Sequence, residues 1–352
     1  MTVLNGFGVY DREEQHNQAY MLRKSIPNYM SSMIERTTNG GEDGGDDGGE
    51  DGDDGNVTIV FYTNNAWDEG RIKWVTGHGK ASNNPKCHIL YTNSFGLQPL
   101  YHRGGTIDAI VLAESTTPLE VLQTLQKAQN FYQPMFLLAE HEAPALTWRN
   151  PKQFIGFSGL ISYSKQSTIY GPWGKTIEGV SSPTASYPNP RSTTKLGMIM
   201  ISNCIATARK DILLSVMEHI PIEVYGDCQF GNNTHGRIPA NDNQVVVDIM
   251  RQHKFYFAFE SEVCDDYITE KFWRPLVVGL IPVVHGLNKT VYEKIAPPNS
   301  FVHIEEFAGP KALAEGLQRI ADDEEVYWEY HKWRRNYAVV YGRCTPRIFV
   351  DG

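Results

Sequence analysis

The sequence contains little cysteine, and no two of its cysteines stand at C-x-x-C spacing. The five cysteines are scattered through 352 residues, which excludes a zinc knuckle and a dithiol redox motif. No histidine pair has the spacing of metal ligands on a helix, and Asp265 and Asp266 favour a helix N-terminus over a metal site. We therefore expect reduced thiols and no bound metal.

Long apolar runs are absent as well. No stretch approaches the roughly 20 apolar residues of a membrane-spanning helix. The opening residues, MTVLNGFGVYDREEQ, also lack the apolar core of a secretory signal. The sequence therefore predicts a chain without a membrane span.

The chain has no excess of positive charge. It carries 32 basic and 41 acidic residues, but residues 42–55 hold eight of the acids and no base, which leaves 33 acidic against 32 basic residues. This balance gives no electrostatic case for nucleic acid or an anionic membrane as a partner. Segment 39–55 combines glycine with like charges and cannot bury apolar surface, so we expect a disordered insertion within an N-terminal region, 1–55. Its spacing does not match a calcium-binding EF-hand loop.

From Asn56 onward, apolar runs of strand length alternate with helical segments. The first series contains VTIVFYT, HILYTNSF, IDAIVLAES and PMFLLAE, with an amphipathic helix at 119–130. The second series contains GMIMIS, IEVYG, FYFAFE and IPVVHG, with helices at 207–219 and 243–253 and from Tyr267. This alternation predicts parallel sheets of the α/β class.

Residues 179–194, GVSSPTASYPNPRSTT, separate the two series. They are rich in Ser, Pro and Thr without apolar periodicity, which is typical of an interdomain linker. The sequence thus predicts two Rossmann-like domains, 56–178 and 195–352, the second ending in closing helices. Two such domains face a central cleft, with ligands at the carboxyl ends of the strands.

The segment 255–286 places a polar loop and a helix between two buried strands. Tyr267, Glu270 and Lys271 stand at i, i+3 and i+4, so a helix that includes all three presents them on one face. Thr269 is a candidate cap of that helix. A ring, a carboxylate and an ammonium group beside a helix N-terminus suit a nucleotide diphosphate. An exposed helix with an ordinary charged face would have the same residues, and this alternative to a nucleotide site stays open.

The run F-Y-F-A-F-E-S-x5-Y-I-T-E-K-F-W-R resembles the signature F-x-F-x-F-E-N-x5-Y-x-T-E-K of glycosyltransferase family 10, the α-1,3/4-fucosyltransferases. Upstream, HEAPALTWRNPKQFIGFSGLISYSKQSTIYGPWG resembles the family's E-S-P segment and F-N-x-T-L-S-Y-R-x-D-S-D-x-x-x-P-Y-G. Ser202, Asn203, Ala208 and Arg209 resemble its S-N-x-x-x-x-A-R segment. The resemblance implies a GT-B architecture, a GDP-β-L-fucose donor, and inverting transfer of L-fucose to a hydroxyl of a glycan acceptor, with an α-1,3-type linkage.

The resemblance also implies roles for individual residues. Glu142 matches the general base, because inverting transfer is a single in-line displacement in which one carboxylate takes the acceptor proton. Glu140 and His141 are close rivals for this role. Arg209 matches the arginine that clamps the diphosphate, and Lys271 adds a second positive charge. Because these cations stabilise the departing GDP, neither a metal nor another cofactor is expected.

Tyr267 and Glu270 are expected to hold the guanosine, and Ser261 to contact the donor sugar. Ser261 stands where the family has Asn, Trp173 where it has Tyr, and residues 165–168 where it has R-x-D-S-D. Ser reaches less far than Asn. The sequence therefore leaves two alternatives open: a GT-B transferase that uses another nucleotide sugar, and a non-catalytic protein that binds a nucleotide sugar or a glycan.

The resemblance bears on localisation too. Eukaryotic family members usually carry a membrane anchor and work in the Golgi lumen, whereas bacterial and viral members can lack the anchor. With no anchor in its sequence, the chain is expected to be a cytoplasmic enzyme of the bacterial or viral type, or a Golgi enzyme whose anchor has been removed.

Overall fold

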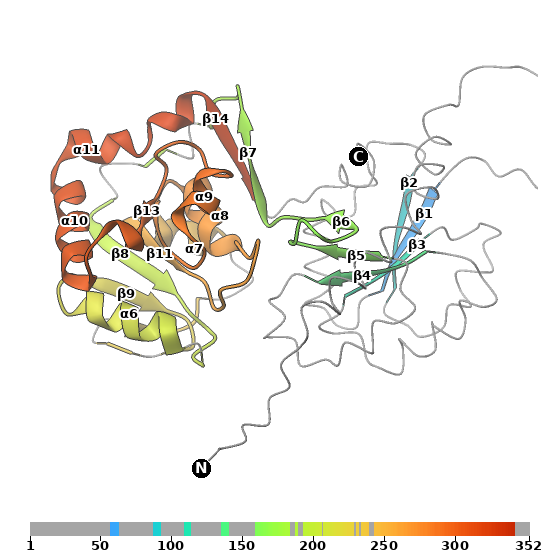
Figure 1. The fold of residues 1–352 in the computed structure, drawn as a ribbon, viewed down its shortest axis with the longest axis horizontal. Helices are drawn as coiled ribbons and strands as arrows, with labels where there is room; N and C mark the ends of the chain where they lie inside the picture. The colour runs from blue at the N-terminus through green and yellow to red at the C-terminus, as the bar shows by residue number, and fades with distance from the viewer. Residues whose placement is uncertain are drawn as a thin grey trace, which may run out of the picture. The chain divides into compact units, whose positions relative to one another are not determined.

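The computed structural model describes four strands within the first 158 residues and then residues 159–341, with gaps at 184–186, 189–192, 206, 229, 232–233 and 239–242. The N-terminal region 1–55, with its insertion 39–55, and the expected helix 119–130 lie outside the described residues. The chain falls into two compact units, the first made of residues 1–171 with 345–352 and the second of residues 172–344. Figure 1 shows their strands and helices.

The first unit contains a parallel sheet of six strands in the order β2-β1-β3-β4-β5-β6. The strands are β1 (Val57–Tyr62), β2 (Cys87–Thr92), β3 (Ala109–Ala113), β4 (Met135–Glu140), β5 (Gly159–Ser162) and β6 (Ile169–Tyr170). Strand β1 pairs in parallel with both β2 and β3. The four strands predicted from the apolar runs of the first series are confirmed as β1 to β4. Each run contributes most of the residues of one strand.

The second unit contains another parallel sheet, in the order β10-β9-β8-β11-β12-β13. Its strands are β8 (Lys195–Met200), β9 (Ile222–Tyr225), β10 (Thr234–His235), β11 (His253–Phe259), β12 (Ile281–His285) and β13 (Val302–His303). The α-helices are α6 (Thr207–Met217), α7 (Asn243–Met250), α8 (Glu270–Val278), α9 (Lys289–Glu293), α10 (Pro310–Asp322) and α11 (Glu324–Glu329), and the 3₁₀ helices are η4 (Ile304–Glu306) and η5 (Lys332–Arg335).

Side chains of β11 alternate between two cores, one on each face of this second sheet. Phe255, Phe257 and Phe259 pack in the cluster that includes residues of α6 and α10. Tyr256 and Ala258 pack in the cluster that includes residues of α7 and α8. Alternation is the geometry of a strand, and burial on both faces explains why FYFAF is apolar throughout.

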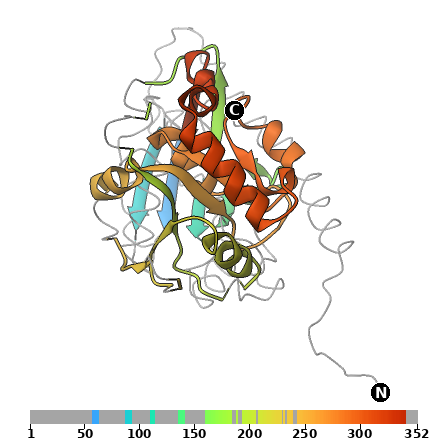
Figure 2. The same cartoon turned by 90° about the vertical axis from the view of Figure 1, so that its left-hand side faces the viewer.

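Helices α10 and α11, in orange-red, lie on the viewer's side in Figure 2.

The unit boundary differs from the predicted one. Strand β7 (Gly174–Glu178), which we expected in the first domain, pairs antiparallel with β14 (Tyr337–Tyr341). The expected linker also joins the second unit where it is described, since Gly179 N donates to Asn336 O at 2.8 Å and Ser182 N to Arg334 O at 2.8 Å. Loop-like composition does not reveal such pairing, because backbone groups of any residue type can form it.

Helix α8 begins at Glu270, three residues later than predicted, with Thr269 as its N-cap. It ends at Gly279, whose φ of 112° is left-handed and whose N–H donates to Pro275 O. Glycine adopts this conformation without strain, which explains the sharp stop before β12. In the described part of the chain, no helix is both long and apolar enough to cross a bilayer.

Candidate functional site

The two central strands of the second sheet, β8 and β11, define the candidate site. From β8 the chain continues to β9 on one side, and from β11 to β12 on the other. The carboxyl ends of two such strands diverge at a topological switch point, where open α/β sheets bind ligands. The loop 201–206 leads from β8 to α6, and the loop 260–269 leads from β11 to α8. Most of the predicted donor-binding residues lie in these loops or in the first turns of the helices that follow them.

Arg209 lies in the first turn of α6 and is only 3% exposed. Its Nη1 donates to Phe259 O at 3.3 Å and its Nη2 to Asn203 O at 2.6 Å, so the side chain connects the end of β11 with the loop that follows β8. Its Nε has no hydrogen-bond partner among the described residues. Burial lowers the pKa of Arg209, and the charge of Glu260 opposes that shift. Arg209 is therefore a buried cation rather than a solvated surface charge, and its Nε is left unsatisfied by the described residues.

Glu260 follows β11 directly, and its side chain is 1% exposed. The carboxylate accepts hydrogen bonds from Thr269 N at 2.8 Å and from Thr269 Oγ1 at 2.9 Å. Burial raises the pKa of Glu260, while the charge of Lys271 lowers it in part. Sequence reasoning gave this residue no role. The sequence does contain a sign of this role: Glu260 is an acidic residue directly after the apolar run FYFAF of β11. A carboxylate buried at such a position needs hydrogen-bond or charged partners.

Lys271 and Glu270 occupy the first turn of α8. Lys271 Nζ lies 3.1 Å from Thr269 Oγ1, 3.3 Å from Glu270 Oε1 and 3.5 Å from Glu260 Oε2. Burial disfavours the charge of Lys271, but Glu270 and Glu260 outweigh burial and raise its pKa. Burial also opposes ionisation of Glu270, but Lys271 and Arg274 lower its pKa to about 2. Both groups are therefore charged at neutral pH, and both keep part of their surface open, 18% for Lys271 and 28% for Glu270.

Tyr267 lies in the turn before α8 rather than on its face, and the residue is 1% exposed. Its ring therefore has no open face on which a base could stack in this structure. The expected shared face of Tyr267, Glu270 and Lys271 was wrong, because the helix starts after Tyr267.

The other sequence-predicted residues fall in three places. Ser261 is half-buried and follows Glu260 in the loop after β11. Trp173 packs partly buried against the core that contains α8 residues. Glu142 lies outside the described residues, two positions after the end of β4 at Glu140, and His141 lies outside them too.

The segment 165–168, which departs from the family's R-x-D-S-D, forms the turn between β5 and β6. Ser167 Oγ donates to Ser164 O at 2.6 Å, and Thr168 Oγ1 accepts from Leu160 N at 3.1 Å. These hydroxyl groups thus stabilise the turn itself. Within the part of the chain that the structure describes, no group of three or more His, Cys, Asp or Glu residues could hold a metal ion.

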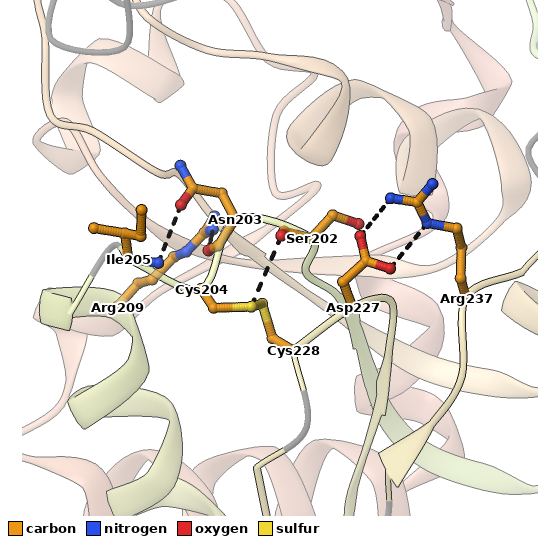
Figure 3. Close-up of a disulfide and its surroundings, with 8 residues drawn as sticks. All are labelled: Ser202, Asn203, Cys204, Ile205, Arg209, Asp227, Cys228 and Arg237. Atoms are coloured by element: carbon orange, nitrogen blue, oxygen red, sulfur yellow. Dashed lines mark hydrogen bonds and ion pairs between the residues drawn. A yellow bond between two sulfur atoms is a disulfide. The ribbon is translucent and has the colours of Figure 1, made fainter.

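Cys204 and Cys228 form a disulfide beside this site (Figure 3). The expectation of reduced thiols was therefore wrong for these two residues. Their Cα atoms lie 5.4 Å apart, although 24 positions separate them in sequence. They meet because each follows the carboxyl end of one of two adjacent parallel strands, β8 and β9. Cys264 is a free thiol.

Comparisons with known proteins agree with these observations. Residues 190–347 match the family model described as glycosyltransferase family 10 (fucosyltransferase) C-term. The 4-galactosyl-N-acetylglucosaminide 3-alpha-L-fucosyltransferase of Pongo pygmaeus is 32% identical over 195 residues, 55% of this chain and 52% of the relative. The 3-galactosyl-N-acetylglucosaminide 4-alpha-L-fucosyltransferase of Homo sapiens is 33% identical over 180 residues, 51% of this chain and 47% of the relative. The chain thus spans about half the length of the curated relatives it matches.

Solved structures extend the similarity to the fold. A crystal structure of an alpha1,3-fucosyltransferase covers 86% of this chain and 88% of its own, with a TM-score of 0.52 and 11% identity. Another, of an alpha1,3-fucosyltransferase with GDP-fucose, covers 86% and 87% with a TM-score of 0.50 and 12% identity. The predicted α/β fold of the GT-B type, and the predicted resemblance to family 10, are confirmed.

Proposed function

We propose, on the premise that residues 190–347 form a glycosyltransferase family 10 C-terminal domain, that this protein is an inverting α-fucosyltransferase. It transfers L-fucose from GDP-β-L-fucose to a hydroxyl group of a glycan acceptor, with an α-1,3-type linkage. The curated relatives are named as 3-alpha and 4-alpha fucosyltransferases, and a structural neighbour is described with GDP-fucose. The acceptor is the second partner of the reaction.

One observation in this chain carries the proposal. Arg209 is buried at the switch point of a parallel sheet, and its Nε lacks a partner among the described residues. A buried guanidinium donor without a partner is unfavourable, and a phosphate oxygen satisfies it with a charge-assisted hydrogen bond. Lys271, partly exposed at the N-terminus of α8, adds an ammonium group 3.5 Å from the Glu260 carboxylate. The charge of Glu260 also acts on Arg209. These groups suit a diphosphate.

The proposed chemistry follows from this charge arrangement. As the bond between fucose and the diphosphate breaks, negative charge develops on GDP, and Arg209 and Lys271 stabilise it without reorganising. We assign Glu142 as the base that takes the proton of the acceptor hydroxyl, in a single displacement that inverts the anomeric centre. Glu270 is the candidate acceptor for the ribose hydroxyls, and Ser261 for the sugar. Because two cations already face the leaving group, the reaction needs no metal or other cofactor.

The deciding measurement is release of GDP from GDP-fucose in the presence of a panel of glycan acceptors, with and without EDTA. GDP-mannose and UDP-sugars serve as competing donors. They are included because Ser261 stands where the family has Asn, which leaves the identity of the donor sugar open. Turnover of GDP-fucose that survives EDTA supports donor, reaction class and metal independence together. Faster turnover of another donor supports the alternative transferase, and GDP binding without any turnover supports the non-catalytic alternative. Glu142→Gln should retain GDP binding and lose transfer.

The compartment in which the protein works is a further part of the proposal. The sequence predicted either a cytoplasmic enzyme or a Golgi enzyme whose anchor has been removed. The Cys204–Cys228 disulfide favours an oxidising compartment, because cytosolic reductants keep most thiols reduced. We therefore propose an oxidising compartment such as the Golgi lumen. The test is alkylation of free thiols in the protein taken directly from its cells, followed by mass spectrometry. Alkylation of both Cys204 and Cys228 without prior reduction would contradict this compartment.

A further inference from the structure

We propose that the Cys204–Cys228 disulfide positions Arg209 for the diphosphate of the donor; this inference rests on the proposed function. Cys204 follows Asn203 directly, and the carbonyl oxygen of Asn203 accepts the 2.6 Å hydrogen bond from Arg209 Nη2. Figure 3 shows the guanidinium group of Arg209 beside Asn203, with the disulfide next along the chain. The cross-link is therefore attached one residue away from Asn203, which supplies the shorter of the two hydrogen bonds that hold the guanidinium group of Arg209.

The two halves of the disulfide differ in how firmly they are held. Cys228 is 2% exposed, packs in the core cluster of the sheet, and donates its N–H to Ile201 O at 3.2 Å. Cys204 is exposed, and the next residue, Ile205, is 84% exposed. Few apolar contacts hold the outer part of this loop. The disulfide thus ties an exposed loop to a buried anchor, which limits the positions that the Asn203 carbonyl can take.

The other contacts of the loop are weaker constraints. Asn203 Oδ1 accepts from Ile205 N at 3.1 Å, a bond within the loop that does not connect it to the sheet. Ser202 interacts with Asp227, which pairs with Arg237 through two hydrogen bonds. Asp227 and Arg237 are largely exposed, and exposed ion pairs contribute little to stability. Among the residues that the structure describes, the disulfide is therefore the covalent restraint on residues 202–205, beside the hydrogen bond from Arg209 to Asn203 O.

Reduction removes this restraint in a defined way. A dithiol reductant transfers two electrons and two protons, the Sγ–Sγ bond breaks, two thiols form, and the reductant closes to its own disulfide. Asn203 can then shift, and Arg209 loses the fixed position of one of its two backbone acceptors, Asn203 O, while Phe259 O remains. Small displacements of a positioned group can lower rates by about 100-fold. We expect a loss in donor affinity, because Arg209 faces the donor, with little change in the acceptor KM.

The experiment measures GDP binding by isothermal titration calorimetry, and KM and kcat for GDP-fucose, in oxidised and dithiothreitol-reduced full-length protein. We expect reduction to weaken GDP binding by about tenfold or more, a free-energy change of about 1.4 kcal/mol or more. The variant Cys204→Ser/Cys228→Ala should bind GDP as weakly as the reduced protein and should not respond to dithiothreitol. The control variant Cys264→Ser, which removes a free thiol, should respond to reduction as the wild type does.

The Arg209→Ala background tests whether the effect passes through Arg209. Two positions that act through one contact are non-additive, so reduction should change GDP binding less than about twofold in this background. An equal loss with and without Arg209 would overturn the positioning role. Equal GDP affinity in oxidised and reduced wild type, with only a lower Tm after reduction, would show a purely structural cross-link. Absence of GDP binding in the oxidised wild type would instead overturn the proposed function.

Discussion

The buried carboxylate of Glu260 lies 3.5 Å from the ammonium group of Lys271. The same carboxylate accepts two hydrogen bonds from Thr269, the N-cap of α8. One acidic residue thus links the end of β11, the start of α8 and one of the two cations of the candidate site. This arrangement makes Glu260 a residue whose loss affects both stability and the charge of the site.

Glu260→Ala should lower the free energy of unfolding by about 3 kcal/mol, because it leaves the donors of Thr269 unsatisfied and the charge of Lys271 without a buried partner. Equilibrium unfolding in urea measures this change. The control is Glu315→Ala on α10, where the side chain is exposed and substitution should change stability by less than about 0.5 kcal/mol. Equal stability of the two variants would show that Glu260 has no such capping role.

Arg209→Lys should weaken GDP binding by about 100-fold. Lysine keeps the positive charge, but it cannot donate to Phe259 O and Asn203 O and also present a further donor in a fixed plane. Calorimetric titration with GDP measures the loss. Lys210→Ala, which removes the neighbouring charge on α6, serves as the control and should bind GDP within about threefold of the wild type. Comparable affinity in Arg209→Lys would remove the guanidinium group from the diphosphate site.

Gly174 packs directly against the indole ring of Trp273 on α8. A Cβ atom at position 174 would lie 2.5 Å from the Cγ and Cδ2 atoms of that ring. Gly174→Ala should therefore lower the free energy of unfolding by about 1–3 kcal/mol, because the buried ring has little space to move. Gly236→Ala is the matched control, since no atom lies within 4 Å of its Cβ position. Denaturant midpoints distinguish the two, and an unchanged midpoint for Gly174→Ala would mean that Trp273 can shift freely.

Much of the fold could be predicted from apolar patterns, whereas much of the site could not. The continuous run of Phe255 to Phe259 predicts a strand buried on both faces, and the structure confirms it. The i, i+3, i+4 spacing of Tyr267, Glu270 and Lys271 does not tell where a helix starts. Thr269 decides that, because its side chain accepts from Lys271 N and begins the helix after Tyr267.

Contacts between distant segments account for the remaining errors. The disulfide depends on β8 and β9 being adjacent, and sequence spacing alone does not give the order of strands in a sheet. The partners of Glu260 lie nine or more positions away, beyond the reach of a local motif. Strand β7 pairs with β14, more than 150 positions later in the sequence. This pairing places β7 in the second unit and not in the first domain, where we expected it. In each case the sequence shows the residue, but its partner can be identified only when the order of the strands in the sheet is known.

Acid should destabilise the protein through Glu223 in β9. Burial opposes ionisation of this carboxyl group, but hydrogen bonds from Tyr225 and Lys195 lower its pKa to about 2. Tyr225 Oη lies 2.7 Å and Lys195 Nζ 2.9 Å from the carboxylate. Since the folded pKa is below the unfolded value of 4.5, the contribution is fully present above pH 4.5 and is lost as pH falls toward about 2.

Glu223→Gln should therefore be less stable than the wild type at pH 7 and should approach it in stability near pH 2, because the amide has no charge to lose. Urea unfolding at several pH values between 7 and 2 measures the difference between the two proteins. This difference removes the contribution of Glu270, whose pKa is also about 2. His253 Nε2 lies 3.2 Å from the Glu223 carboxylate, so the loss of that partner by His253 is part of the measured difference. Glu218→Gln, at an exposed position after α6, is the control and should parallel the wild type at every pH. A gap between Glu223→Gln and wild type that stays constant from pH 7 to 2 would show that packing at this position, rather than the charge of Glu223, stabilises the sheet.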